Sequence, residues 1–314
     1  MRANPLAHPR PVGQEERTMA VTLRNLSYLV ALADTGHFGR AAERVAISQP
    51  ALSQQIKELE AELGLQLVER GREIRLTRSG VAVVERARAI LGAVRDLEET
   101  ARRTAGLSGP LRLGLIPTVA PYLLPHLLPL IGGRGLELTV MEAVTERLLA
   151  ALGDGDVDAA VVALPVSGDF AADPLFEDRF LLASSRDEPP PGALQPEDVA
   201  ADRLLLLDEG HCLADQALAV CNTRRGRTAL GAASLTTLSR LVADGYGITL
   251  LPEMAVPVEG RGLILTPFAA PEPSRTIGLV RRLSATTPDW VPELCDVLRH
   301  AHRTLTATAA NTAP

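Results

Sequence analysis

Apolar side chains at intervals of three and four residues predict three helices near the start of the chain. The first is expected over 23–35 and a short second one over 39–46. A third begins after Ile47, since Ser48 suits an N-cap and proline is tolerated in a first helical turn. Two short helices joined by a tight turn are typical of a helix-turn-helix.

The third helix is rich in Ser and Gln, whose hydroxyl and amide groups read base edges in the major groove of DNA. A helix that only faces solvent would also be polar, but a hairpin with further arginines follows and favours DNA recognition. The candidate DNA-binding residues are Arg40, Ser48, Gln49, Pro50, Ser53 and Gln54 for the helices, and Arg72 and Arg75 for phosphate contacts from the hairpin.

The pattern after the third helix predicts a hairpin and then a long helix. Residues 67–77 alternate and turn at a glycine, which is typical of a short wing. An amphipathic pattern over 79–105 carries interspersed Glu and Arg, as on a helix that pairs with its copy in a second chain. The Gly-Leu-Ser-Gly-Pro sequence at 106–110 is expected to end this helix and act as a hinge.

Beyond residue 110 strands and helices alternate, which predicts an α/β fold with a mostly parallel sheet and helices on both faces. The expected strands are 111–116, 136–140, 159–164, 180–183, 204–207, 248–251 and 277–280. The expected helices are 123–131, 145–152, one that contains two cysteines, 235–243 and 292–305.

Length and charge favour more than one domain. A chain of 314 residues with 46% hydrophobic and 22% charged residues is long for one domain and comfortable for two or three. Residues 1–110 carry 16 Lys and Arg against 13 Asp and Glu, a balance of +3, and the remainder carries 16 against 25, a balance of −9. A mildly basic N-terminal part and an acidic C-terminal part indicate a nucleic-acid-binding domain joined to a different domain.

The three cysteines are too few for a disulfide framework, which indicates a reducing cytoplasm. No apolar run reaches the roughly 18 residues of a membrane span, and the first 20 residues lack the apolar core of a secretory signal. We therefore expect a disordered leader over 1–21, a cytoplasmic location and no membrane partner.

Two of the cysteines, Cys212 and Cys221, lie nine residues apart in a segment with a helical pattern. Nine residues turn a helix through about 900° and rise about 13.5 Å, which places the two side chains on opposite faces. A disulfide needs Cα atoms within about 7 Å, so these cysteines can join only after the helix unwinds. The spacing favours a redox switch over a structural disulfide.

The expected position of Cys212 supports this interpretation. It lies at or near a helix N-terminus, where unpaired N–H groups and the helix dipole stabilise a thiolate. A thiolate attacks peroxide oxygen to become sulfenic acid, which a second thiol converts to a disulfide. By spacing alone the pair could equally be two inert, buried cysteines, and Cys295, on the apolar face of the last helix, is expected to be one.

A resemblance to a known family covers residues 22–303. The sequences Ala-Ala at 41–42, Ser-Gln-Pro-Ala-Leu-Ser at 48–53 and Leu-Glu at 59–60 resemble the winged helix-turn-helix of LysR-type transcriptional regulators. Gly-Tyr-Gly-Ile-Thr-Leu-Leu-Pro at 245–252 is similar to their effector domain. Within that family, Gly-His-Cys at 210–212, Asp-Gln at 215–216, Cys221, the segments at 116–118 and 121–125, and Arg-Thr-Ile-Gly-Leu at 275–279 resemble the hydrogen-peroxide-sensing subfamily.

The resemblance implies a domain order. It runs from a winged helix-turn-helix (22–80) through a linker and dimerisation helix (81–108) to a periplasmic-binding-protein-like effector domain of two α/β subdomains (109–303). Subdomain I covers about 110–178 and 276–303, subdomain II about 179–275, and residues 304–314 form a disordered tail. The implied partners are double-stranded DNA at inverted repeats, further copies of the chain as a dimer or tetramer, RNA polymerase, and hydrogen peroxide as the signal.

The resemblance also implies roles for individual residues. Cys212 would be the peroxidatic cysteine and Cys221 the resolving one. The peroxide pocket would be formed by Thr118, Thr145, His211, Asp215 and Arg275. One position departs from the subfamily: Ala214 stands where these proteins often carry arginine, which puts the peroxide sensitivity in question.

Two alternative functions remain open at this point. A LysR-type regulator could instead respond to a small carboxylate bound between the subdomains, with Thr118 as a ligand-binding residue and the cysteines as bystanders. A thiol peroxidase would use the same cysteines but would leave the helix-turn-helix unexplained, so we expect no enzyme. The spacing of residues gives no support for a metal site or a cofactor.

Overall fold

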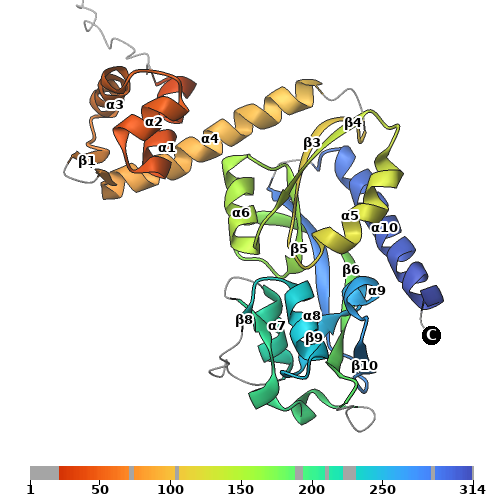
Figure 1. Cartoon of the computed structure of the whole chain (residues 1–314). Coiled ribbons are helices and arrows are strands. Elements are labelled where there is room, and N and C mark those ends of the chain that lie inside the picture. The colour runs from red at the N-terminus through yellow and green to blue at the C-terminus, as the bar shows by residue number, and fades with distance from the viewer. Residues whose placement is uncertain are drawn as a thin grey trace, which may run out of the picture. The chain divides into compact units, whose positions relative to one another are not determined.

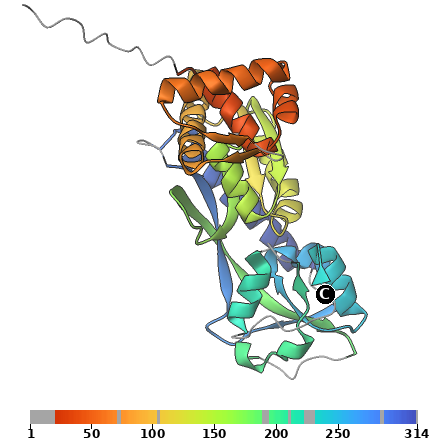
Figure 2. The same ribbon diagram turned by 90° about the vertical axis from the view of Figure 1, so that its left-hand side faces the viewer.

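The computed structural model describes residues 21–70, 74–102, 106–187, 194–208, 212–221, 231–283 and 287–312. The chain forms two units, one up to Leu91 and one from Gly92 onward, and each is considered by itself (Figures 1 and 2). Within the part of the chain that the structure describes, no helix is long and apolar enough to cross a membrane.

The first unit contains the expected three helices, α1 (Leu23–Thr35), α2 (Phe38–Arg44) and α3 (Gln49–Leu63). Their ends follow from local capping: Thr22 and Asn25 form a capping box at the start of α1, and the Ser48 side chain caps α3 by accepting from the Ala51 N–H. Apolar residues of the three helices, with Leu29 and Leu52 fully buried, close a small core.

The wing and the long helix are also present. Strands β1 (Val68–Arg70) and β2 (Ile74–Leu76) pair antiparallel, and α4 runs from Arg78 to Arg102. A β-carbon at Gly80, in the first turn of α4, would collide with the backbone carbonyl of Leu67. Glycine at this position therefore lets α4 start directly against the backbone that leads into β1, the first strand of the wing.

The second unit is built on a seven-stranded sheet in the order β10-β6-β11-β5-β3-β4, with β9 also paired to β6. The prediction of a mostly parallel sheet is wrong, because among the described strands of this sheet only β3 with β4 and β3 with β5 are parallel. β6 pairs antiparallel with β9, β10 and β11, and β11 pairs antiparallel with β5. The bounds are β3 (Gly109–Leu115), β4 (Leu136–Glu142), β5 (Ala159–Leu164), β6 (Phe170–Ser185), β9 (Thr249–Pro252), β10 (Leu263–Pro267) and β11 (Ser274–Arg282).

Strands β6 and β11 run the length of this unit, and the helices gather at its two ends (Figure 1). Near one end lie α5 (Ala120–Ile131), α6 (Thr145–Asp154) and α10 (Trp290–Thr312). At the other lie α7 (Cys212–Val220), α8 (Leu235–Ala243) and α9 (Val256–Glu259), with β7 (Leu206–Leu207), β8 (Gly231–Ala232) and the short helices η1 (Pro196–Asp198), η2 (Ala201–Arg203) and η3 (Glu253–Ala255).

Three further expectations differ from the structure. Helix α10 continues to Thr312, so the predicted disordered tail is wrong for residues 304–312. Gly109 and Pro110, predicted as part of a hinge, pair with β4 as the first residues of β3. β6 is much longer than the predicted strand at 180–183. The prediction missed its first half, because most residues there are exposed or half-buried and form no continuous apolar run.

Candidate functional site

The two candidate redox cysteines flank α7: Cys212 is its first residue and Cys221 directly follows its last, so the structure confirms that the segment between them is helical. α7 begins at Cys212, so this side chain occupies the first helical turn. The Cys221 N–H still donates to the Ala217 carbonyl at 3.0 Å, which extends the helical hydrogen bonding to the second cysteine. Both thiols are free. Because a helix holds residues nine positions apart at a rise of about 13.5 Å, the two sulfurs cannot bond until α7 unwinds.

The environments of the two thiols differ. Cys212 is half-buried, whereas Cys221 is buried in the core of the unit. Burial raises the pKa of the Cys221 thiol from 9.0 to about 11, because the apolar surroundings disfavour the thiolate. In the reduced fold Cys221 is therefore held as a neutral thiol, and it becomes reactive only when the helix opens.

This difference predicts unequal alkylation by iodoacetamide near pH 8. A pKa raised from 9.0 to about 11 lowers the thiolate fraction of Cys221 by roughly a hundredfold relative to an ordinary thiol. We expect Cys212 to be labelled first and Cys221 to follow only in urea, where its pKa returns to the ordinary value. Peptide mass analysis of both cysteines measures this, and equal labelling rates in the native protein would contradict it.

The same pKa fixes the sign of a stability effect. Because the folded-state pKa of Cys221 lies above the unfolded value, its contribution to the free energy of unfolding is fully present below about pH 9. That contribution is lost as the pH rises through about 11, where the buried thiol ionises.

Thr118 and Arg275, two of the predicted pocket residues, are in direct contact. Arg275, only 3% exposed, donates from Nη1 to Thr118 Oγ1 at 2.9 Å and from Nη2 to the Thr118 carbonyl at 3.2 Å. Its charge is balanced by Asp178, which accepts from Nε and Nη2 at 3.0 and 2.8 Å. Asp178 and Arg275 are opposite partners in β6 and β11, so the sheet register itself brings the ion pair together.

A cavity of about 420 Å³ lies beside this cluster. It is bordered by the first turns of α5, α6 and α8, and its walls are both polar and apolar. A second buried contact closes one side, where Tyr122 and Thr236 both donate to Glu259 Oε1, at 3.1 and 2.7 Å. The lining residues include Thr118, Tyr122, Glu142, Arg147, Leu207 and Ser234.

Among the described residues, the structure does not bring the remaining predicted pocket residues into hydrogen-bonding contact with Thr118 and Arg275. Thr145 is the first residue of α6, beside the cavity wall, and its Oγ1 is buried without a partner among the described residues. Asp215 is exposed in the first turn of α7. Within the described residues, neither hydrogen-bonds to Thr118 or Arg275. His211 lies outside the described residues.

Sequence reasoning missed Asp178, Tyr122 and Glu259. Asp178 stands between Glu177 and Arg179, and nothing in this run of charged residues distinguishes the buried carboxylate from its exposed neighbours. Tyr122 could have been noticed, since one of only three tyrosines follows Thr118 by one helical turn.

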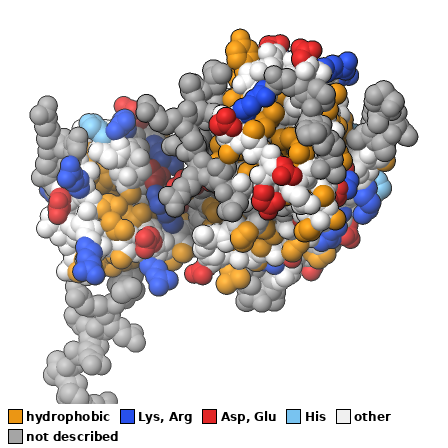
Figure 3. Space-filling view, turned by 90° about the horizontal axis from the view of Figure 1, so that it is seen from below, with side chains coloured by type: hydrophobic (Ala, Val, Ile, Leu, Met, Phe, Trp, Pro, Cys, Tyr) orange, Lys and Arg blue, Asp and Glu red, His pale blue; other side chains and the backbone are white. Residues whose placement is uncertain are grey.

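The candidate DNA-binding residues that the structure describes lie on the first unit and are exposed or half-buried. Gln49, Pro50 and Gln54 are exposed on the first turns of α3, and Ser53 is half-buried. Arg40 is exposed on α2 and donates to the Thr35 carbonyl, while Ser48 is exposed and serves as the N-cap of α3. Arg75 is exposed on β2, and Arg72 lies outside the described residues. Basic and acidic side chains are interspersed on the face drawn in Figure 3.

Comparison with known proteins agrees with this arrangement. Residues 23–81 match the bacterial regulatory helix-turn-helix protein model of the lysR family, and residues 104–303 match the LysR substrate binding domain model. The chain is 43% identical over 290 residues to the DNA-binding transcriptional dual regulator OxyR of Escherichia coli K12, covering 89% of this chain and 95% of that protein.

Solved structures give the same result. A full-length cysteine-to-aspartate mutant of OxyR from Pseudomonas aeruginosa is 36% identical with a TM-score of 0.68, covering 90% of this chain and 97% of that one. A peroxide-bound cysteine-to-serine mutant of OxyR from Corynebacterium glutamicum is 36% identical with a TM-score of 0.62, covering 93% and 97%. The chain therefore belongs to the LysR family of bacterial helix-turn-helix regulators, and within it to the OxyR group.

Proposed function

We propose that the protein is a DNA-binding transcription regulator that responds to hydrogen peroxide through Cys212 and Cys221. The observation that carries the proposal is the placement of the two cysteines at opposite ends of α7, with Cys212 half-buried in its first turn and Cys221 buried directly after its last residue. The relatives reported above are OxyR proteins, one of them solved with peroxide bound. The alternative of a small carboxylate signal is not favoured by these relatives.

The proposed reaction of the two cysteines with hydrogen peroxide has two steps. The Cys212 thiolate attacks one peroxide oxygen, so that an S–O bond forms, the O–O bond breaks, and the departing hydroxide takes a proton to leave as water. The Cys221 sulfur then attacks the sulfenic acid sulfur, so that the S–S bond forms and the S–O bond breaks with loss of a second water. The two electrons that reduce peroxide come from the pair of thiols.

The second step requires α7 to unwind, because its rise of about 13.5 Å between the cysteines exceeds the Cα separation of any disulfide. Unwinding takes Leu213, Ala214 and Ala217 out of the core that they occupy in the reduced form. The effector domain must then repack, and we propose that repacking changes the spacing of the DNA-reading units in a dimer or tetramer.

The DNA partner is proposed to be an inverted repeat, since two-fold related helix-turn-helix units read half-sites about one or more helical turns apart. Residues 22–80 would read the DNA, α4 would pair with its copy, and residues 109–303 would sense peroxide. RNA polymerase is the proposed downstream partner. A regulator of this kind acts beside the chromosome, and thus in the cytoplasm, without cofactor or enzymatic turnover.

The proposal is tested by combining thiol mapping with footprinting. Sub-stoichiometric peroxide is added to the full-length protein, each cysteine is mapped by mass, and promoter DNA is footprinted before and after oxidation. We expect Cys212 to be oxidised first, a Cys212–Cys221 disulfide to follow, and the protected DNA region to change length or spacing. Identical footprints of the reduced and fully oxidised protein would overturn the proposal.

The DNA-reading assignment makes its own prediction. Replacing Gln49 by alanine removes an exposed amide from the first turn of α3, and we expect operator affinity to fall about tenfold, as for the loss of one base-edge contact. Titration of operator DNA against a scrambled sequence at fixed salt measures it. Glu62→Gln, at the exposed far end of α3, is the matched control and should leave the ratio of the two affinities unchanged.

A further inference from the structure

Asp178 orients the N–H groups of the Arg275 guanidinium. Nε and Nη2 both donate to Asp178 Oδ2, and Nη1 and Nη2 reach Thr118. The two side chains of the ion pair are each 1% exposed, so water cannot replace either partner. A guanidinium is planar, and fixing one edge on a carboxylate fixes the direction of the opposite Nη1–H.

This contact determines what the Thr118 hydroxyl can do. A hydroxyl has one hydrogen to donate, and Thr118 Oγ1 accepts from an arginine, which cannot act as an acceptor. Its own hydrogen is therefore left for another oxygen or for sulfur. Thr118 is 2% exposed yet lines the cavity, and among the described residues no acceptor takes this hydrogen.

We propose that Asp178 is a positioning residue for the peroxide reaction: it orients Arg275 so that Thr118 is fixed as a hydrogen-bond donor to an oxygen atom bound in the cavity. The inference rests on the proposed function and takes this cavity as the place where hydrogen peroxide meets Cys212, so that the bound oxygen atom is one of peroxide. Asp178 does not touch peroxide itself. It acts by holding the donor in the direction in which negative charge develops on the departing oxygen.

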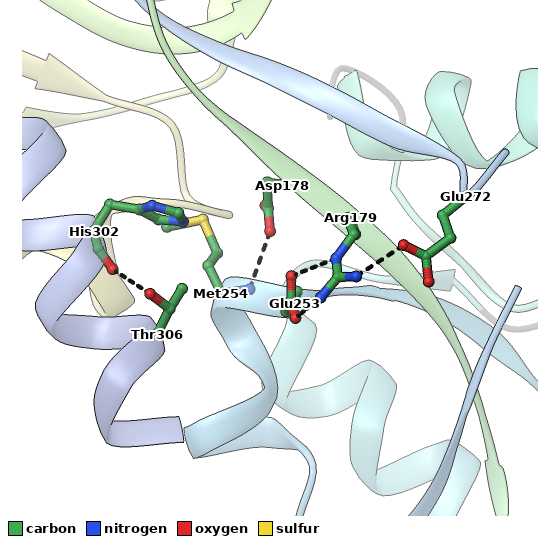
Figure 4. Close-up of polar contacts among 7 residues, drawn as sticks. All are labelled: Asp178, Arg179, Glu253, Met254, Glu272, His302 and Thr306. Carbon is green, nitrogen blue, oxygen red and sulfur yellow. Dashed lines mark hydrogen bonds and ion pairs between the residues drawn. The ribbon is translucent and has the colours of Figure 1, made fainter. Parts of the chain in front are cut away.

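Asp178 is held at its other oxygen by a neighbouring segment. Asp178 Oδ1 accepts from the Met254 N–H at 3.0 Å, and the adjacent Arg179 binds Glu253 and Glu272 (Figure 4). The same segment ends at Glu259, which accepts from Tyr122, one turn after Thr118 on the chain. Hydrogen bonds and short backbone segments thus form a continuous ring of contacts that includes the Asp178 carboxylate. This ring keeps the carboxylate in one position.

Substitution by asparagine has a specific consequence. Asp178→Asn keeps the shape but replaces one carboxylate oxygen by an NH₂ group, which cannot accept, so that either the Met254 N–H or the Arg275 guanidinium loses its acceptor. Arg275 also loses its buried counter-charge. We expect its guanidinium to turn, so that Nη1 no longer fixes the Thr118 hydroxyl.

The test compares two reagents on Cys212 in the full-length protein. Iodoacetamide alkylates the thiolate without a departing oxygen, so it reports exposure and ionisation of Cys212 alone. We expect Asp178→Asn to lower the second-order rate constant for peroxide by about ten- to a hundredfold while the iodoacetamide rate constant changes less than about twofold. Glu177→Gln, an exposed carboxylate on the same strand that also binds β11 side chains, is the matched control and should leave both rate constants unchanged.

A double variant separates positioning from a general structural effect. If Asp178 acts through the Thr118 hydroxyl, Asp178→Asn adds little to the loss caused by Thr118→Val. Losses that multiply, or equal losses for peroxide and iodoacetamide, would overturn the inference. Were wild-type Cys212 itself to react no faster with peroxide than Cys221 in urea, the proposed function would fail instead, so the two failures are distinguishable.

A second substitution covers the case in which Asp178→Asn does not fold. Asp178→Glu keeps the charge but moves the carboxylate by one methylene, and we expect the peroxide rate constant to fall at least about threefold at an unchanged iodoacetamide rate constant. A peroxide rate constant equal to that of wild type in this folded variant would also overturn the inference.

Discussion

Replacing Cys212 by serine is expected to abolish the response to peroxide. A serine hydroxyl is not a nucleophile toward peroxide oxygen at neutral pH, and the remaining Cys221 is a buried thiol whose pKa is raised to about 11. We expect the rate constant for protein thiol oxidation to fall at least about a thousandfold, and the DNA footprint to stay that of the reduced form. Thiol quantification and footprinting across a peroxide titration measure both.

The matched control is Cys295→Ala. Cys295 is 4% exposed on α10, and burial raises its pKa to about 11 as well, so it should contribute nothing to the response. Retention of a peroxide-dependent footprint by the Cys212→Ser variant would contradict the assignment. Induction of that variant by a small carboxylate would instead support the alternative signal.

A proline in α7 is expected to accelerate disulfide formation by roughly 150-fold. Ala219 is exposed near the end of the helix, so its replacement by proline removes no core side chain. Proline lacks the N–H that bonds to the carbonyl four residues earlier and clashes with that carbonyl, which costs about 3 kcal/mol in a helix interior. If resolution of the sulfenic acid requires an open helix, this energy appears as a higher rate of disulfide formation.

The rate is measured by trapping sulfenic acid with dimedone at intervals after one equivalent of peroxide. Ala219→Gly is the matched control, because glycine destabilises a helix by only about 1 kcal/mol and should accelerate the step about fivefold. The rate constant for the first step, oxidation of Cys212, should change little in either variant. Equal disulfide rates in wild type and both variants would show that helix opening does not limit the second step.

The features that the sequence predicted correctly depend on neighbours along the chain. The helix-turn-helix follows from apolar spacing and from caps such as Thr22 and Ser48, which bond within three residues of themselves. The helix between Cys212 and Cys221 follows from the same short-range pattern. Its unwinding on oxidation stays a prediction. The family motifs then identified Thr118 and Arg275, which the structure brings into contact.

Tertiary structure decided the features that depend on pairing over long separations. Alternating strands and helices indicate a parallel sheet, but the long β6 and β11 pair antiparallel and change its topology. Whether a carboxylate in the run Glu177-Asp178-Arg179 is buried depends on which strand lies opposite. Asp178 contacts Arg275, 97 residues later in the chain, only because β11 pairs with β6 in this register. Local preference acts over a few residues and therefore fixes helices and caps. Burial and charge pairing depend on the folded partner, and so the positions of Asp178 and Glu259 could be known only from the three-dimensional structure.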